Sequence, residues 1–361
     1  MQDVLRGADF EQSSLFKKIY QQEFGMPGGE PYGLLIGDYL LNLQPSDGCG
    51  YRRNLLALEV IAEIAMASFV PFVTSVGAEL FAINDYREMS RQFDLEAVLG
   101  HVDYTRWRQF CAKEVARFIG LILPTMLYPT EDSACHAPQL RWGSAIYALA
   151  AVVGRSFIKT RWFLDAFGLP RADEADLGGI VPDLLAPKEA LDDPHAERLL
   201  LTVVNLTPSQ EHSCQQLGLM TVISLPDGRA LLSHGPMLKA AHFSPIGEVD
   251  QDISSQLPYL LCVCRFAQYI KIIGRNKIGQ IHSAKAFEHT LQNWLLTYIA
   301  SNNDLSPEMK VKFPLQDGRV SIQPKPGSSH HYRCALRLSP HLRTTHVTAS
   351  VVLTTELTTT Y

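Results

Sequence analysis

The sequence predicts an α+β fold, a mixed α/β body with β-strands at its C-terminal periphery. Helix-like and strand-like segments are interspersed without the regular alternation that a doubly wound parallel sheet requires. One segment, over 254–275, is apolar around most of its circumference, which is typical of a buried helix. After residue 316, runs rich in Thr and Val are broken by proline and glycine, which predicts strands joined by turns.

In the first half of the chain, helices and strands are expected in irregular order. Ser13 or Ser14 can cap a helix that runs to Phe24, and glycines follow it. The further elements expected are a strand over 32–43, a helix over 51–68, an extended piece after Pro71, helical segments over 94–99 and 103–112, a buried strand over 116–123 and an alanine-rich helix over 142–158.

In the second half of the chain, strands are expected to dominate towards the end. Asp227-Gly228 between two apolar runs is a strong signal for a hairpin turn. The other elements expected are a strand over 198–206, a short helix over 208–217, helices over 254–275 and 284–300, and strands over 319–323, 330–338 and 345–357.

A narrow polar stripe runs along the expected helix over 254–275. Its members lie three or four positions apart and therefore share one helix face: Arg265, Gln268, Lys271 and Arg275. The three cations of this stripe are candidates for a polar interface with an acidic partner. A solvated helix face is the alternative interpretation.

Composition limits the class of protein. The 361 residues are 46% hydrophobic and 19% charged, enough to bury a substantial core. The net charge of −5 argues against a nucleic-acid footprint across the protein. The segment 165–198 carries nine acidic and three basic residues with several prolines and glycines, so it is expected to be a solvated loop. We expect a division into an α/β body over 1–316, which includes this acidic loop, and a β-strand region over 317–361.

The sequence predicts a cytoplasmic protein with no membrane span. Its N-terminal residues lack an apolar segment after a basic start, so no signal peptide is expected. No uninterrupted apolar stretch reaches the length of a membrane-spanning helix. The seven cysteines form no CxxC pair, and their odd number favours free thiols in a reducing compartment.

Motifs that would indicate catalysis or cofactor binding are missing. The sequence contains no GxxxxGK[ST], no HExxH and no GxSxG. His330 and His331 are adjacent, and neighbours on a strand face opposite sides, so the pair cannot easily chelate one metal ion. We therefore expect no enzyme, no cofactor and no metal. The alternative is an enzyme that lacks any recognisable motif.

Six blocks in order resemble the large subunit of the type VI secretion contractile sheath, the family called TssC, VipB, ImpC or EvpB. The resemblance is closest in LPYLLCVCRFAQYIKIIGRNKIG, over 257–279. The other blocks are SSLFKKIYQQEFGMPGGEPYGLLIGDY (13–39), IAEIAMASFVPFVTSVGAELF (61–81), DYTRWRQFCAKEVARFIGLILPTML (103–127), RWGSAIYALAAVVGRSF (141–157) and the tail YRCALRLSPHLRTTHVTASVVLTTEL. Family members carry an additional N-terminal region before the first block.

The resemblance implies a structural subunit rather than an enzyme. Its implied partners are the small sheath subunit (TssB or VipA), further copies of itself and the Hcp hexamers of the inner tube, which contraction would propel. An AAA+ unfoldase of the ClpV type is a less certain partner, because the family displays the helix it recognises in that additional region. A non-polymerising paralogue of the sheath or baseplate is the alternative.

The strands at the C-terminus are the predicted means of assembly. A terminal strand either closes an antiparallel sheet of its own chain, which composition alone favours, or pairs with other chains, which the resemblance favours. The candidate residues for intersubunit strands are Val320, Ile322, Tyr332, Leu336, Leu338, Val347, Ala349, Val351 and Leu353.

Overall fold

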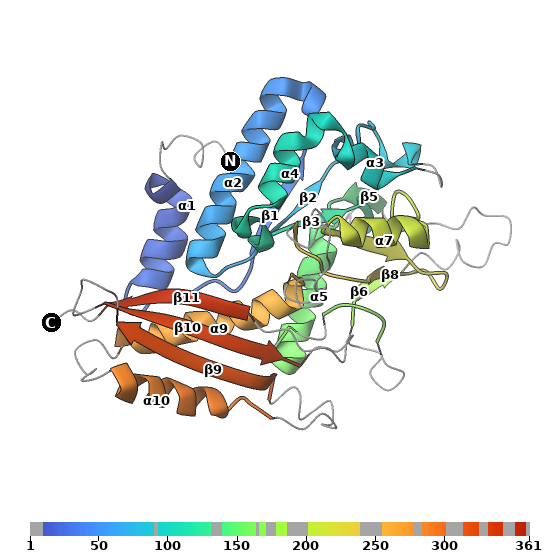
Figure 1. Cartoon of the computed structure of the whole chain (residues 1–361). Coiled ribbons are helices and arrows are strands. Elements are labelled where there is room, and N and C mark those ends of the chain that lie inside the picture. The colour runs from blue at the N-terminus through green and yellow to red at the C-terminus, as the bar shows by residue number, and fades with distance from the viewer. Residues whose placement is uncertain are drawn as a thin grey trace.

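The computed structural model confirms the α+β class (Figure 1). A six-stranded mixed sheet has the order β1-β2-β3-β7-β8-β6, and a three-stranded sheet has the order β11-β10-β9. A two-stranded ribbon pairs β4 with β5. The structure describes residues 10–89, 93–130, 139–163, 166–170, 178–185, 201–238, 255–276, 284–300, 313–324, 331–341 and 351–358.

The strands of the large sheet are mostly short and buried. β1, β2, β3 and β7 run parallel, and β8 and β6 continue the sheet in antiparallel pairing. The strand bounds are β1 Leu35–Leu41, β2 Phe72–Val76, β3 Ile119–Leu123, β4 Met126–Thr130, β5 Gln139–Gly143, β6 Ile180–Leu185, β7 Leu219–Ser224 and β8 Arg229–Leu232.

The helices begin and end close to the positions that their patterns predict. The Ser13 hydroxyl accepts the Phe16 N–H at 3.1 Å, so Ser13 is the N-cap that the sequence indicates. The helices are α1 Ser14–Phe16, the π-helix η2 Lys17–Gly25, α2 Gly48–Ser68, α3 Leu95–Gly100, α4 Thr105–Cys111, α5 Ile146–Thr160, α7 Pro208–Gln216, α9 Leu257–Asn276 and α10 Ala284–Leu296. Short 3₁₀ turns are η1 Phe10–Gln12, η3 Pro45–Asp47, η4 Ala78–Phe81, η5 Tyr86–Glu88, η6 Val102–Tyr104 and η7 Glu114–Phe118.

The hairpin predicted at Asp227-Gly228 is present. It joins β7 to β8, and Gly228 has a φ of +80°, a backbone conformation that glycine adopts without strain. The prediction of a strand over 198–206 is wrong for the residues of this range that the structure describes. Only Thr202 forms a bridge, to Met126, and the chain then turns into the N-cap of α7 at Thr207. Two backbone hydrogen bonds make this bridge, from the Leu127 N–H to the Leu201 carbonyl at 2.8 Å and from the Val203 N–H to the Thr125 carbonyl at 3.1 Å, and the pairing extends no further in the described residues.

The prediction of a continuous loop over 165–198 is also wrong, because β6 lies inside this acidic segment. β6 pairs with β8, and Ile180 and Val181 are buried in the sheet. Gly179 precedes them, and a Cβ there would lie 1.9 Å from the Leu232 carbonyl oxygen, so glycine lets the two backbones meet. Only a short apolar run marks this strand among the charges around it.

Deleting residues 172–195 is therefore expected to destabilise the protein. The deletion removes β6 and the burial of Ile180 and Val181, which contributes about 3 kcal/mol or more to the free energy of unfolding. Thermal unfolding of the purified chain checks this result. A shorter deletion, of residues 187–195, keeps β6 and is the control. Equal midpoints for both deletions would contradict a structural role for β6.

The helix α9 is the central element of the core. Leu257, Leu261 and Cys264 are at most 1% exposed, which confirms the burial predicted for its apolar side. Among the described helices, α9 alone is long and apolar enough to cross a membrane, with a mean hydropathy of 1.2, but 72% of that window is buried inside the protein. Figure 1 shows α9 lying between the three-stranded sheet and the rest of the protein.

The C-terminal sheet is a meander of three antiparallel strands. Its members are β9 Leu315–Pro324, β10 His331–Pro340 and β11 Val351–Thr358. β10 is central, and the Tyr259 hydroxyl of α9 donates to the Leu338 carbonyl at 3.0 Å. In the isolated chain, the last strand therefore pairs with its own neighbour.

Candidate functional site

The C-terminal sheet turns one apolar face towards the core. Val320, Ile322, Leu336 and Leu338 are buried, and Tyr332 is half-buried. The side chains that alternate with them are polar and exposed on the opposite face: Arg319, Gln323, Arg333 and Arg337. These candidate residues of β9 and β10 therefore anchor the sheet to the protein, and a further strand would have to pair with a backbone edge.

The remaining candidates lie in or before the last strand. Val351 pairs with Leu338, and Leu353 pairs with Leu336. Val347 and Ala349 lie outside the described residues. β11 is one edge of the sheet, and no described strand continues the sheet beyond it.

The alternation of hydrogen bonds along the sheet determines which backbone groups of β11 face that open edge. Val320 donates its N–H to a side chain of α10, so Val320 and Leu336 form a pair without mutual hydrogen bonds. Leu336 therefore directs its N–H and C=O towards β11, where its partner is Leu353. Because backbone groups alternate along a strand, those of Val352 and Thr354 point away from β10. The open edge thus presents donors and acceptors at every second residue.

The side chains of the polar stripe on α9 contact other elements of the same chain. Arg265 donates to the Arg161 carbonyl at the end of α5, and its guanidinium lies 4.7 Å from the ring centre of Trp162. Lys271 lies 4.2 Å from the ring centre of Phe24, and Arg275 donates to the Phe24 carbonyl at 3.2 Å. Arg265 and Lys271 thus make internal cation–π contacts, and Arg265 and Arg275 donate hydrogen bonds to carbonyl groups at the ends of helices.

Gln268, also in this stripe, is 6% exposed. Its amide donates to the Tyr32 carbonyl at 2.8 Å, the Phe69 carbonyl at 3.0 Å and the Ser68 carbonyl at 3.4 Å. Phe69 is the left-handed C-cap of α2, with a φ of 52°. The stripe therefore contacts the C-terminal ends of η2, α2 and α5, where helix carbonyl groups lack partners within the helix.

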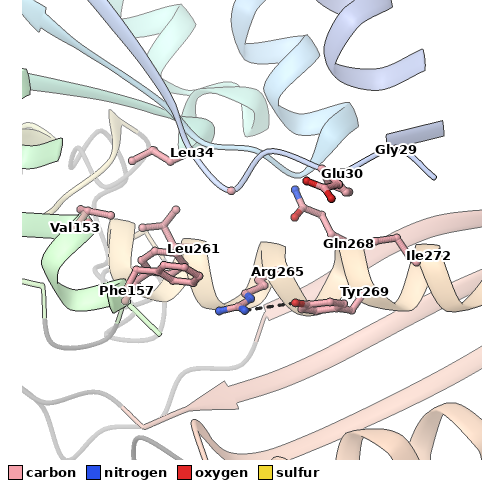
Figure 2. A pocket seen from close by; sticks show the side chains of 14 residues that line it. Gly29, Glu30, Leu34, Val153, Phe157, Leu261, Arg265, Gln268, Tyr269 and Ile272 are labelled. Carbon is pink, nitrogen blue, oxygen red and sulfur yellow. Dashed lines mark hydrogen bonds between the residues drawn. The ribbon is translucent and has the colours of Figure 1, made fainter. Parts of the chain in front are cut away.

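A cavity of about 570 Å³ lies beside the stripe, between residues 29–34, α5 and α9 (Figure 2). Most of its lining is apolar, for example Leu34, Val153 and Leu261. Arg265 lies in its wall with its guanidinium held among aromatic rings, and it donates to the Tyr269 hydroxyl at 3.4 Å (Figure 2). Among the described residues that line the cavity, Glu30 has the one carboxylate. These described residues do not bring together a nucleophile, a base and an orienting group.

Cysteine and histidine chemistry adds no site in the described part of the chain. Burial raises the pKa of the Cys214 and Cys334 thiols to about 12, so both stay protonated at neutral pH. Within the described ranges, no three His, Cys, Asp or Glu side chains are placed to hold a metal ion. His330 and His346 of the tail lie outside those ranges.

Comparison with known proteins identifies the relatives of this chain. The EvpB/VC_A0108 tail sheath N-terminal domain matches residues 1–232, and the EvpB/VC_A0108 tail sheath gpW/gp25-like domain matches residues 247–357. A curated relative, the type VI secretion system sheath protein TssC1 of Pseudomonas aeruginosa, is 27% identical over 372 residues, which cover 98% of this chain and 72% of the relative. The second match includes α9 and α10 with the C-terminal sheet, and the division expected at residue 316 stays a prediction.

Proposed function

The chain belongs to the EvpB/VC_A0108 tail sheath family, as a structural subunit of the type VI secretion contractile sheath, and we propose that it joins its neighbours by strand addition at the β11 edge. The family is one of structural sheath proteins, and its members work with a small sheath subunit and with copies of themselves. The proposal therefore concerns how this chain makes those contacts.

The observation that carries the proposal is the open backbone edge of β11. An unpaired edge presents N–H and C=O groups to which an extended segment of another chain can bond. The apolar face of the same sheet is packed in the core, so an added strand becomes continuous with a rigid body. Each backbone hydrogen bond contributes only about 0.5–1.5 kcal/mol net, but a ring of subunits repeats the contact many times.

In this proposal, the added strand comes from a neighbouring sheath subunit, either the small subunit or another copy. The assembled sheath lies in the cytoplasm around the inner tube of Hcp hexamers. Contraction draws on energy stored in the extended lattice, and this chain hydrolyses nothing. Disassembly by a ClpV-type unfoldase belongs to the same proposal.

Co-expression with a small sheath subunit tests the proposal. We expect tubules by negative-stain electron microscopy when both chains are present and none when this chain is expressed alone. Hydrogen exchange of the purified tubules should show new protection at Val352 and Thr354, whose backbone groups point to the open edge. Tubules without that protection would contradict strand addition at β11. If the two co-expressed chains form no tubules, the result would contradict the proposal that this chain is a polymerising subunit.

A further inference from the structure

We propose that α10 guards the β9 edge of the C-terminal sheet, so that a strand from another sheath subunit can add only at β11. This inference rests on the proposed function. A three-stranded sheet has two edges, and both could accept a strand. Side chains of α10 occupy the β9 edge by bonding to outward backbone groups of Gly318, Val320 and Ile322. Figure 1 shows α10 beside β9, on the side away from β10.

Gln292 of α10 imitates the peptide group of a neighbouring strand. Its amide nitrogen donates to the Gly318 carbonyl at 3.0 Å, and its amide oxygen accepts the Val320 N–H at 2.9 Å. A primary amide has one acceptor oxygen and two donor hydrogens in one plane. A peptide group likewise has an acceptor oxygen in one plane with its single donor hydrogen. One side chain thereby bonds to two successive outward groups of β9.

Further contacts extend the guard in both directions along β9. The Glu288 carboxylate accepts the Ile322 N–H at 2.8 Å. At the other end, the Leu315 N–H donates to the Tyr298 carbonyl at 3.2 Å, and the Ala300 N–H donates to the Leu315 carbonyl at 2.9 Å. Leu315, Gly318, Val320 and Ile322 of β9 thus each have at least one outward backbone group bonded within the chain.

Close packing holds α10 in this position. Phe287, Leu291 and Leu295 are at most 4% exposed. A Cβ at Gly318 would lie 2.9 Å from Leu295 Cδ2, so the absence of a side chain there lets the helix approach the strand. An incoming strand would have to break the side-chain hydrogen bonds and also lift this apolar face away from the core. In the described part of the chain, no strand pairs with β11 on the side away from β10, and the helix that contacts β11 is α9, which also contacts β10.

Hydrogen exchange of the isolated wild-type chain, read at single residues, compares the two edges directly. We expect the amides of Val320 and Ile322 to exchange at least about tenfold more slowly than those of Val352 and Thr354. In tubules formed with a small sheath subunit, the β11 amides gain protection and the β9 amides stay unchanged. Equal exchange at the two edges of the isolated chain overturns the guard, and so does assembly that protects β9 instead of β11.

Variants of α10 test the side chains themselves. Glu288→Ala should accelerate exchange at Ile322 about tenfold, whereas Glu288→Gln, which keeps an acceptor oxygen, should stay within about twofold of wild type. Gln292→Ala should accelerate exchange at Val320 and make the isolated chain self-associate in sedimentation velocity. His289→Ala, at an exposed position on the same helix, is the control and should do neither.

The outcomes separate the guard from the proposed function. A folded Gln292→Ala protein that exchanges and sediments like wild type overturns the guard, whether or not tubules form. If Gln292→Ala fails to fold, the Glu288→Ala and Glu288→Gln pair decides the matter at Ile322. The absence of wild-type tubules would contradict the proposed function alone, because the two edges are compared in the isolated chain.

Discussion

Replacing Thr354 by proline is expected to abolish tubule formation while the isolated chain stays folded. The Thr354 N–H points to the open edge of β11, so proline there removes no hydrogen bond within the chain. The pyrrolidine ring instead projects into the space that an added strand would occupy. A junction held by a few hydrogen bonds of about 0.5–1.5 kcal/mol each does not survive the loss of a donor together with a steric clash.

Two further variants make this result specific. Leu353→Pro removes a donor to β10 and should lower the free energy of unfolding of the isolated chain by about 1–3 kcal/mol. Val351 has the same orientation as Leu353, so proline there also tests the sheet of the chain itself. Thr354→Val keeps the N–H and a β-branched shape and should form normal tubules. Tubules from Thr354→Pro would contradict assembly through this edge, as would a Thr354→Pro chain that unfolds as readily as Leu353→Pro.

Replacing Gln268 by methionine is expected to lower the stability of the core by several kcal/mol, although the side chain keeps its size. Methionine keeps the length and much of the volume of glutamine but cannot donate to the carbonyl groups of Tyr32 and Phe69. A buried polar group left without its partner costs about 1–3 kcal/mol. With two such groups, we expect the free energy of unfolding to fall by about 2–4 kcal/mol.

Denaturant unfolding of the isolated chain measures this effect. Tyr269→Phe, on the next residue of α9, is the control because Tyr269 is 41% exposed and keeps its ring in the variant. Its unfolding free energy should stay within about 0.5 kcal/mol of wild type. A Gln268→Met protein as stable as Tyr269→Phe would show that water or other groups can replace the amide at the end of α2.

Local patterns were sufficient for most elements and for the family. The capping hydroxyl of Ser13 and the turn at Asp227-Gly228 act through neighbours a few residues away, so their effect can be read directly from the sequence. The apolar circumference of α9 likewise predicts a buried helix without knowledge of its partners. The ordered blocks along the whole chain identified a sheath subunit, which the family matches confirm.

Only the tertiary structure decided which backbone and side-chain groups bond to one another. β6 was missed because two buried residues, Ile180 and Val181, give little signal within an acidic segment, and the strand is stable only beside β8. The cations of α9 have a helical spacing that is equally compatible with an interface. Their partners within the chain are distant in sequence, as Phe24 is from Arg275, which donates to its carbonyl. A pattern along the chain records polarity, whereas a hydrogen bond requires a partner that folding brings near.

The same reason explains the two edges of the C-terminal sheet. The sequence by itself determined that strands form after residue 316, because Val- and Thr-rich runs separated by Pro and Gly have that tendency in any context. It did not determine which edge is closed, because Gln292 and Glu288 look like ordinary polar positions of a helix. They close the β9 edge only after Leu291 and Leu295 have packed α10 against the protein, since that packing brings their side chains within reach of the backbone of Val320 and Ile322.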